Sequence, residues 1–119
     1  MQTQIGILKK NVIDALGLSI DEKPIFMGDQ NIDHMKNTHP EDFKKYSDDI
    51  SDIIQNPTYV SLHPNNNSIQ YIKEYIREGK HILLAVRASG KGIFFARTLF
   101  EMTETKFNNY KNSGRLIRI

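Results

Sequence analysis

The hydrophobic positions at the start of the chain recur at helical spacing, which predicts an N-terminal helix within residues 1–18. The apolar side chains that repeat every three or four positions are Ile5, Leu8, Val12, Ile13 and Leu16. Gly17 follows them and suits the left-handed conformation that often ends a helix. We therefore expect this helix to pack one apolar face on the rest of the fold.

Between residues 23 and 57 the pattern predicts one short strand and three short helices. Residues 23–28 (KPIFMG) form an apolar run typical of a strand. A helix over residues 31–37 has Asn31 or Asp29 as its candidate cap. Pro40 suits the first turn of a second helix, and Ser47 suits the cap of a third helix that Asn56 and Pro57 end.

After residue 57 the pattern changes to that of strands and turns. Residues 69–77 remain ambiguous, because Ile69, Ile72 and Ile76 fit a helix whereas Ile69, Tyr71, Lys73 and Tyr75 fit one face of a strand. The other predicted elements are strands over residues 58–62, 80–88 and 93–100, turns over 63–68 and 89–92, and short edge strands over 106–110 and 115–119.

This order of elements predicts an α+β fold in which N-terminal helices pack on a small antiparallel sheet. The 119 residues fit a single domain, with residues 1–18 as the helix and residues 24–119 as the core. Hydrophobic residues make up 39% and charged residues 25%, which is typical of a globular protein. The chain has no cysteine, no signal-peptide pattern at its start and no membrane-spanning apolar run, so we expect a cytoplasmic protein.

The charge is unevenly divided between the two halves of the chain. Residues 1–59 contain six Lys and Arg against ten Asp and Glu, a net charge of −4. Residues 60–119 contain ten against four, a net charge of +6, together with most of the aromatic side chains. Interleaved cations and rings suit nucleic acid, since cations neutralise phosphate and rings stack on bases. Strands that carry Lys and Arg on a solvent-exposed face explain the same charges. Only the nucleic-acid interpretation predicts that these cations gather on one positive concave face.

The predicted hairpin offers the most informative surface of the chain. If residues 88 and 93 pair, Ala85 and Ala96 share a face with Arg87 and Thr98, and the two small side chains leave room for a ligand. The opposite face is apolar except for Arg97, which needs an anionic partner or access to solvent. A salt bridge to a helix carboxylate and a phosphate-binding role both satisfy Arg97.

Other chemistries find little support in the sequence. Gly90 and Gly92 suit the hairpin turn, and the segment around them is too short for a Walker loop. His34 and His39 are five residues apart and would point apart on one helix, although a break at His39 could bring them together. No histidine or carboxylate spacing indicates a metal site, and no motif indicates a cofactor.

Several stretches of the chain follow one order: a helical segment with histidines, an I-x-x-P helix end, and a sheet whose late strand carries Arg and Thr. The stretches are HMKNTHPEDFKKY, DISDIIQNPTYVSLHP, SIQYIKEY and HILLAVRASGKGIFFARTLF. In this order the chain, from roughly Pro24 to its C-terminus, resembles the phage-associated branch of the barnase–EndoU–colicin–RelE nuclease superfamily. The resemblance implies metal-independent RNA cleavage on the concave face of a small antiparallel sheet.

The resemblance also implies roles for individual residues. His34 matches the general acid or base, with His39 as the alternate, and Arg97 matches the phosphate-binding group beside Thr98, a hydrogen-bond donor. The remaining basic candidates for substrate binding are Lys73, Arg87 and Lys91. Because adjacent residues of a regular strand point to opposite faces, Arg97 and Thr98 share a site only if the strand bulges or one acts from the rim.

The expected reaction is attack of the RNA 2′-hydroxyl on phosphorus, which gives a 2′,3′-cyclic phosphate without metal or cofactor. The expected partners are RNA and, for a toxin or effector of a phage or mobile element, a neutralising antitoxin or immunity protein. Two rival interpretations stay open. One is a non-enzymatic RNA- or protein-binding module with a nuclease-like fold, and the other is an interaction protein whose N-terminal helix docks a partner.

Overall fold

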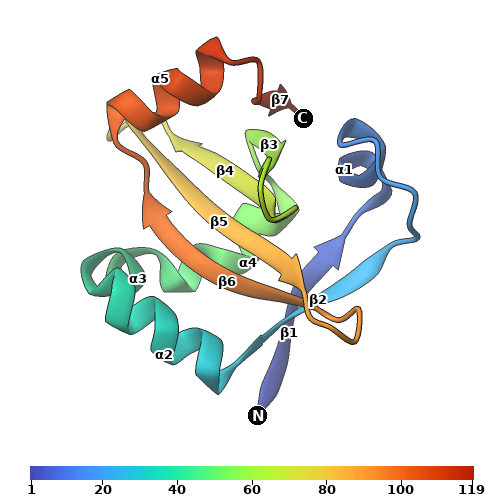
Figure 1. Cartoon of the computed structure of the whole chain (residues 1–119). Coiled ribbons are helices and arrows are strands. Elements are labelled where there is room, and N and C mark those ends of the chain that lie inside the picture. Colours follow the sequence, from blue (N-terminus) through green and yellow to red (C-terminus); the bar gives the residue numbers. More distant parts are fainter.

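A seven-stranded mixed sheet organises the fold in this computed structural model, which describes residues 1–119 (Figure 1). The strand order is β1-β2-β6-β5-β4-β3-β7, with β2 and β6 parallel and all other neighbours antiparallel. The strands are β1 (Gln2–Leu8), β2 (Lys23–Gly28), β3 (Tyr59–Leu62), β4 (Ile69–Tyr75), β5 (Lys80–Ala88), β6 (Phe94–Glu101) and β7 (Ile117–Arg118). The helices are α1 (Lys10–Ala15), α2 (Asp29–Thr38), α3 (Pro40–Tyr46), α4 (Ile50–Gln55) and α5 (Glu104–Asn112).

This architecture confirms the α+β class and corrects its arrangement. The helices are not confined to the N-terminal part, because α5 follows the last long strand. The sheet is not purely antiparallel, because Ile25 and Phe26 of β2 pair in parallel with Phe94 and Phe95 of β6. Residues 69–77 resolve as a strand, β4, followed by a turn.

The prediction of one helix over residues 1–18 is wrong, since most of its first half is strand β1. Gly6 shows why: a Cβ there would lie 2.8 Å from Cγ2 of Ile54, so the β1 backbone packs directly against α4. Leu8, Val12 and Ile13 are all buried, so their helical spacing spans a strand end and a short helix. Gly17 has a φ of +68° and occupies the left-handed position expected of it.

The middle of the chain agrees closely with the sequence pattern. Helix α3 begins at Pro40, and α2 begins at Asp29, two residues earlier than predicted. The Asn31 side chain accepts a hydrogen bond from the Gly28 amide at 2.8 Å, which satisfies a free donor at the start of α2. Ser47 opens a 3₁₀ turn rather than capping α4, which then runs to Gln55.

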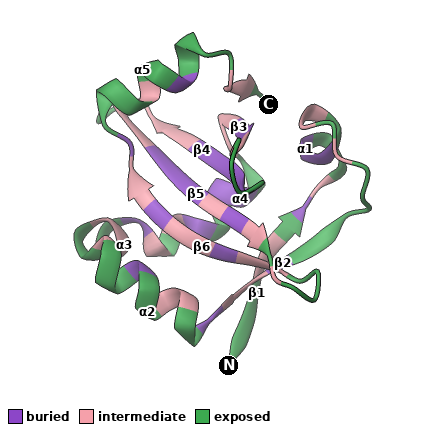
Figure 2. Ribbon diagram, in the orientation of Figure 1, coloured by how far each residue is buried: buried purple, intermediate pink, exposed green.

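The main core lies between one face of the sheet and helices α1 to α4, and Figure 2 shows buried positions along the central strands and α4. Its helical contributors include Val12 and Ile13 of α1, Met35 of α2, Tyr46 of α3, and Ile50, Ile53 and Ile54 of α4. The central strands contribute Ile69, Tyr71, Ile82, Leu84, Val86, Ala96 and Leu99. Burial of these side chains is the principal stabilising contribution to the fold.

Helix α5 covers part of the opposite face of the sheet, where the sequence pattern predicted an edge strand over residues 106–110. The Thr103 hydroxyl accepts a hydrogen bond from the Lys106 amide at 3.1 Å and caps the helix. Tyr110 of α5 and the nearby Met102 pack with Ile72 and Leu83 in a second apolar cluster. This cluster occupies one end of the face and leaves the rest uncovered by helices.

The β5–β6 hairpin has the predicted strands but a shifted register. Its turn contains Gly92 with a φ of +77°, as a hairpin glycine requires. Ala88 pairs with Phe94 rather than with residue 93, and Val86 pairs with Ala96. The next pair, Ala85 with Thr98, skips Arg97, which places a β-bulge at that residue.

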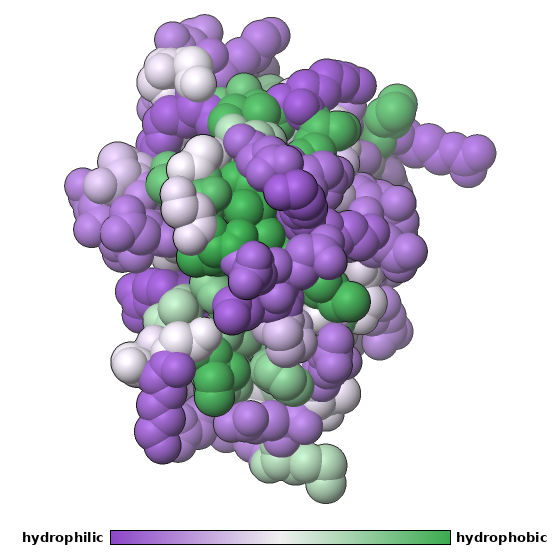
Figure 3. Space-filling model, turned by 90° about the vertical axis from the view of Figure 1, so that its right-hand side faces the viewer, coloured by the Kyte–Doolittle hydropathy of each residue, from purple (hydrophilic) through white to green (hydrophobic).

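The surface beside α1 is largely hydrophilic. Figure 3 shows it with hydrophobic atoms in a broken band between hydrophilic side chains. No helix has both the length and the apolar composition needed to cross a bilayer.

Candidate active site

A cleft of about 490 Å³ lies on the sheet face that α5 only partly covers. Its floor comes from β4, β5 and β6, and its walls come from α2, α5 and the loop between β3 and β4; Figure 1 shows α2 and α5 standing apart on either side of β6. The charged and histidine side chains that line the cleft are His34, His63, Arg87, Arg97 and Lys106. No Asp or Glu lines it, so the cleft suits an anionic ligand.

The β-bulge places Arg97 and Thr98 together in the cleft. Arg97 is the extra residue of β6, and Thr98 pairs with Ala85 on the cleft face. The condition under which these two neighbours share a site is therefore met. Arg97 has no carboxylate within 4.0 Å, and its buried Nε has no hydrogen-bond acceptor. The alternative of a salt bridge to a helix carboxylate does not occur.

The bulge also corrects the predicted position of Ala96. This residue is completely buried in the main core and does not line the cleft, whereas Ala85 does. The extra residue at Arg97 reverses the alternation of side chains along β6, so positions before it face opposite to the prediction. Ala85 alone supplies the small side chain on the cleft floor.

Helix α2 positions His34 on the cleft wall beside Gln30 and Asn31. His34 follows Asn31 by three positions and Gln30 by four, so the three side chains share one helix face. Met35 points to the main core and is fully buried, which fixes the rotation of α2 about its axis. The His34 side chain therefore reaches the cleft from a helix that core packing holds in place.

The positive charge of the cleft comes from three strongly basic side chains on three elements. Arg87 lies on β5, Arg97 on β6 and Lys106 on α5. The Nζ of Lys106 lies 4.6 Å from the centre of the Phe100 ring, which orients the ammonium group along the cleft wall. Neither Arg87, Arg97 nor Lys106 forms an ion pair, so all three charges remain available to a ligand.

Two of the predicted site residues, His39 and Lys91, do not line the cleft. His39 ends α2, and its ring lies tilted by 30° against Phe100 with ring centres 5.3 Å apart, beside a separate small pocket. Lys91 lies in the exposed β5–β6 turn. His34 and His39 are thus not brought together, because His34 lines the cleft and His39 lines the separate pocket.

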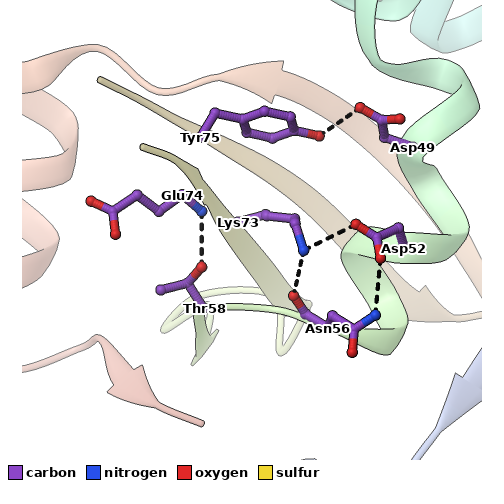
Figure 4. A network of polar contacts seen from close by, with 7 residues as sticks. All are labelled: Asp49, Asp52, Asn56, Thr58, Lys73, Glu74 and Tyr75. Atoms are coloured by element: carbon purple, nitrogen blue, oxygen red, sulfur yellow. Dashed lines mark hydrogen bonds and ion pairs between the residues drawn. The ribbon is translucent and has the colours of Figure 1, made fainter. Parts of the chain in front are cut away.

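Lys73 lies on the opposite face of the sheet, in the network drawn in Figure 4. Its Nζ is 3.0 Å from Oδ2 of Asp52 and donates a hydrogen bond to the Asn56 carbonyl at 2.9 Å. Hydrogen bonds from Asn56 and Lys73 lower the pKa of Asp52. The nearby Tyr75 hydroxyl donates a hydrogen bond to Asp49 at 2.8 Å. Lys73 therefore joins β4 to α4 and does not contribute to the cleft.

The net charges of the two halves of the chain therefore do not predict which basic side chains line the cleft. Of the four basic residues expected on one concave face, Arg87 and Arg97 line the cleft, whereas Lys73 and Lys91 do not. The case for an anionic ligand rests on the local cluster, which includes Lys106, and on the lack of carboxylates there.

Several polar cleft residues are not among the candidates that the sequence offers, including His63, Gln70, Lys106 and Tyr110. The cap at Thr103 followed by Glu104 is a helix start, and a helix there places Lys106 and Tyr110 on one face. Gln70 is the polar residue within an apolar strand run. Nothing in the sequence indicates that the loop carrying His63 folds over the cleft.

His81 lies outside the cleft, under helix α5. Its ring stacks on Phe107 with centres 3.6 Å apart, and its Nε2 is 3.5 Å from Oε2 of Glu74. Burial lowers the pKa of His81, and the attraction of Glu74 opposes this shift. His81 therefore favours its neutral form and acts as a packing residue.

Comparison with models of known protein families shows the family to which the chain belongs. Residues 3–109 match the family model described as "phage-Barnase-EndoU-ColicinE5/D-RelE like nuclease3". The chain belongs to this nuclease family. The match covers β1 through most of α5, so all cleft-lining residues except Tyr110 lie within it. Searches of curated proteins and of solved structures found no match.

Proposed function

We propose that this member of the nuclease family is a metal-independent endoribonuclease whose active site is the cleft between α2 and α5. The observation that carries the proposal is the set of side chains in the cleft. It combines two histidines, two unpaired arginines, a lysine and several hydroxyls, and it contains no carboxylate. This set can bind a phosphodiester and move a proton, whereas carboxylates would be needed to hold magnesium.

RNA rather than DNA is the expected substrate because the reaction takes its nucleophile from the substrate. The 2′-oxygen attacks phosphorus while its proton passes to a general base, and the bond from phosphorus to the 5′-oxygen breaks as that oxygen takes a proton. The products are a 2′,3′-cyclic phosphate and a free 5′-hydroxyl. Neither metal nor water is consumed in this step.

The assigned roles follow from the position of each side chain in the cleft. His34 is the general acid or base, since an imidazole can accept or donate a proton and its side chain lines the cleft. Arg97 and Arg87 bind the phosphate and stabilise the additional charge of the phosphorane. Thr98 donates a hydrogen bond to a phosphate oxygen, and Lys106 adds positive charge from α5.

A second hollow supports a substrate longer than one nucleotide. It shares Gln30, Asn31 and Arg97 with the cleft and continues toward Ser89 and Phe95. Arg97 therefore lies where the two hollows meet. A strand that follows both would carry its scissile phosphate at Arg97 and extend along β6 toward the hairpin turn.

The test is cleavage of defined RNA oligonucleotides by purified protein in excess EDTA. We expect wild-type cleavage to persist in EDTA, His34→Ala to lose about 10²–10⁴-fold in rate, and Arg97→Lys to be impaired because lysine cannot make the bidentate contact. Arg77→Lys, in an exposed turn outside the cleft, is the matched control. Circular dichroism verifies that each variant is folded.

Substrate controls test the nucleophile itself. An RNA with a single 2′-deoxy nucleotide at the cleavage position should stay intact there, and the wild-type product should carry a 2′,3′-cyclic phosphate. Activity that is lost in EDTA and recovered with a divalent cation would overturn the mechanism. If folded wild type cleaves no RNA but binds it in a salt-dependent manner, the protein is instead a non-enzymatic RNA-binding module, the alternative function that the cationic cleft also supports.

Such an activity would be toxic to its own cell unless a partner neutralised it. Expression of wild type in a bacterial host is therefore expected to slow growth, and His34→Ala is expected to relieve this. A neutralising antitoxin or immunity protein would cover the cationic cleft with an acidic surface.

A further inference from the structure

The two ends of the cleft differ in chemistry. Toward α2 and β6 it carries His34 and the arginines, which suit a phosphate. Toward β4 and the loop before it, the lining is neutral and polar, with Asn66, Ser68 and Gln70 below Tyr110 of α5. Amides and hydroxyls bind the edges of bases, whereas cations bind the backbone. The neutral end of the cleft therefore suits a part of the ligand other than the phosphate.

Gln70 is the central residue of the neutral end. Its side chain lines the cleft although the residue is only 4% exposed. The amide Nε2 donates a hydrogen bond to the Tyr110 hydroxyl at 3.0 Å, which holds the amide in one orientation. The opposite atom, Oε1, is buried and receives no hydrogen bond from the protein. A buried acceptor without a donor is costly, so a ligand in the cleft that supplies a donor is favoured.

Gln70 and Thr98 lie in one row across the sheet. Gln70 pairs with Ala85, and Ala85 pairs with Thr98, so the three side chains point to the same face of β4, β5 and β6. Two strand spacings separate Gln70 from Thr98 by about 10 Å. The small Ala85 leaves the space between them open. One nucleotide can bridge this row, with its phosphate at Thr98 and the edge of its base at Gln70.

The loop before β4 adds a hydrogen-bond donor at this end. The Nδ1 of His63 accepts a hydrogen bond from the Asn65 amide at 3.1 Å, which leaves Nε2 as the ring nitrogen that can donate to a ligand. Asn66 accepts a hydrogen bond from the Ser68 amide at 2.9 Å, which orders the same loop. Gln70 supplies an acceptor and His63 a donor, and a base edge presents the complementary pair.

We infer that the neutral end of the cleft binds the base next to the scissile phosphate, and that Gln70 is the residue that determines base specificity. This inference rests on the proposed ribonuclease function. Tyr110 is a positioning residue, because it acts on the base only through the orientation of the Gln70 amide. The enzyme should therefore cleave beside some bases much faster than beside others.

The first experiment measures kcat/KM on four short RNAs that differ in one base beside a single cleavable phosphate. The wild type should discriminate between the best and worst base by roughly 10- to 100-fold, the effect of leaving one buried polar group unpaired. Gln70→Leu should compress this range to less than about threefold, and Tyr110→Phe should weaken it. Gln55→Leu, an exposed glutamine at the end of α4, is the matched control and should keep the wild-type range.

The second experiment uses only the wild type and needs no cleavage. The NMR resonances of the Gln70 side-chain amide are followed during titration with the four 3′-nucleoside monophosphates and, separately, with inorganic phosphate. The nucleotides should shift these resonances in a base-dependent way. Inorganic phosphate should shift Arg97 and Thr98 but leave Gln70 unchanged.

The outcomes separate the inference from the proposed function. If the wild type cleaves RNA without base preference, or if Gln70→Leu keeps the wild-type ranking, the specificity role of Gln70 is overturned while the ribonuclease stands. If the wild type cleaves no RNA, the proposed function fails, and the NMR titration then decides whether the neutral end of the cleft binds a base. Resonances of Gln70 that do not respond to any nucleotide overturn the base-binding subsite as well.

Discussion

Replacement of Arg97 by methionine should make the protein more stable while it weakens anion binding. Methionine keeps the apolar stem of the side chain and removes the guanidinium group. In the structure that group has no carboxylate partner, and its buried Nε has no acceptor. A group held in this way lowers the stability of the free protein and is retained for its ligand.

The magnitude follows from the cost of an unsatisfied buried donor, about 1–3 kcal/mol. Solvent screens the exposed part of the guanidinium, so we expect Arg97→Met to raise the free energy of unfolding by about 1 kcal/mol. An unfolding entropy of about 2.1 cal/mol/K per residue gives about 0.25 kcal/mol/K for the whole chain. The melting temperature should therefore rise by about 4 °C.

The assay is urea and thermal unfolding of wild type, Arg97→Met and the exposed control Arg77→Met, with and without inorganic phosphate. Phosphate at 100 times its dissociation constant should stabilise the wild type by about 2.7 kcal/mol and Arg97→Met by much less. Arg77→Met should stay within about 0.5 kcal/mol of wild type. A loss of more than about 1 kcal/mol in Arg97→Met, or equal stabilisation of both proteins by phosphate, would show that Arg97 is structural.

Three further predictions test the assignments outside the cleft. Lys73→Met should lower the free energy of unfolding in urea by less than about 1 kcal/mol, because its ion pair with Asp52 is partly exposed, and should leave the RNA cleavage rate unchanged. Gly6→Ala should lower it by about 1–3 kcal/mol, because a Cβ there meets α4 at 2.8 Å. Burial lowers the pKa of His81 despite the attraction of Glu74, so on acidification His81 takes up its proton in the unfolded chain before it does so in the folded protein. The free energy of unfolding should therefore fall as the pH drops below about 6.5. Urea unfolding curves between pH 7.5 and pH 5 should show this fall, and His81→Gln should reduce it.

The parts of the fold that the sequence predicts well are those with strong local signals. Pro40 begins α3 as expected, and the three isoleucines of α4 face the core at the predicted spacing. The apolar strands on either side of the glycine-containing turn form the expected hairpin. In each case a start signal, a period and an end signal agree within one short segment.

The errors occur where distant contacts decide the local structure. Residues 2–8 fit a helical period, yet Gly6 lets them lie against Ile54 as an edge strand next to β2. The hydrophobic pattern of residues 2–8 alone does not reveal the contact between Gly6 and Ile54. The prediction of an edge strand over residues 106–110 is wrong because it overlooks Thr103, which caps helix α5. The first error comes from tertiary packing and the second from an overlooked start signal.

The candidate site shows the same division between local and distant information. His34, Arg87, Arg97 and Thr98 were selected from the sequence and line one cleft, whereas His39, Lys73 and Lys91 do not. Strand periodicity specifies a face only while the strand stays regular. The location of the bulge depends on which residues of β6 are buried by the helices on the other face of the sheet. The sequence pattern of β6 does not contain that information.

That dependence explains how the cleft obtains two adjacent polar residues from one strand. Ala96 and Leu99 are both fully buried in the main core, although residues three apart in a regular strand face opposite sides. Only an extra residue between them lets both reach the core, and Arg97 and Thr98 are the two residues that then open on the cleft. Burial on one face of the sheet thus specifies the geometry of the cleft on the other. A substitution at Leu99 that relieved this constraint would alter the position of Arg97 without touching the cleft itself.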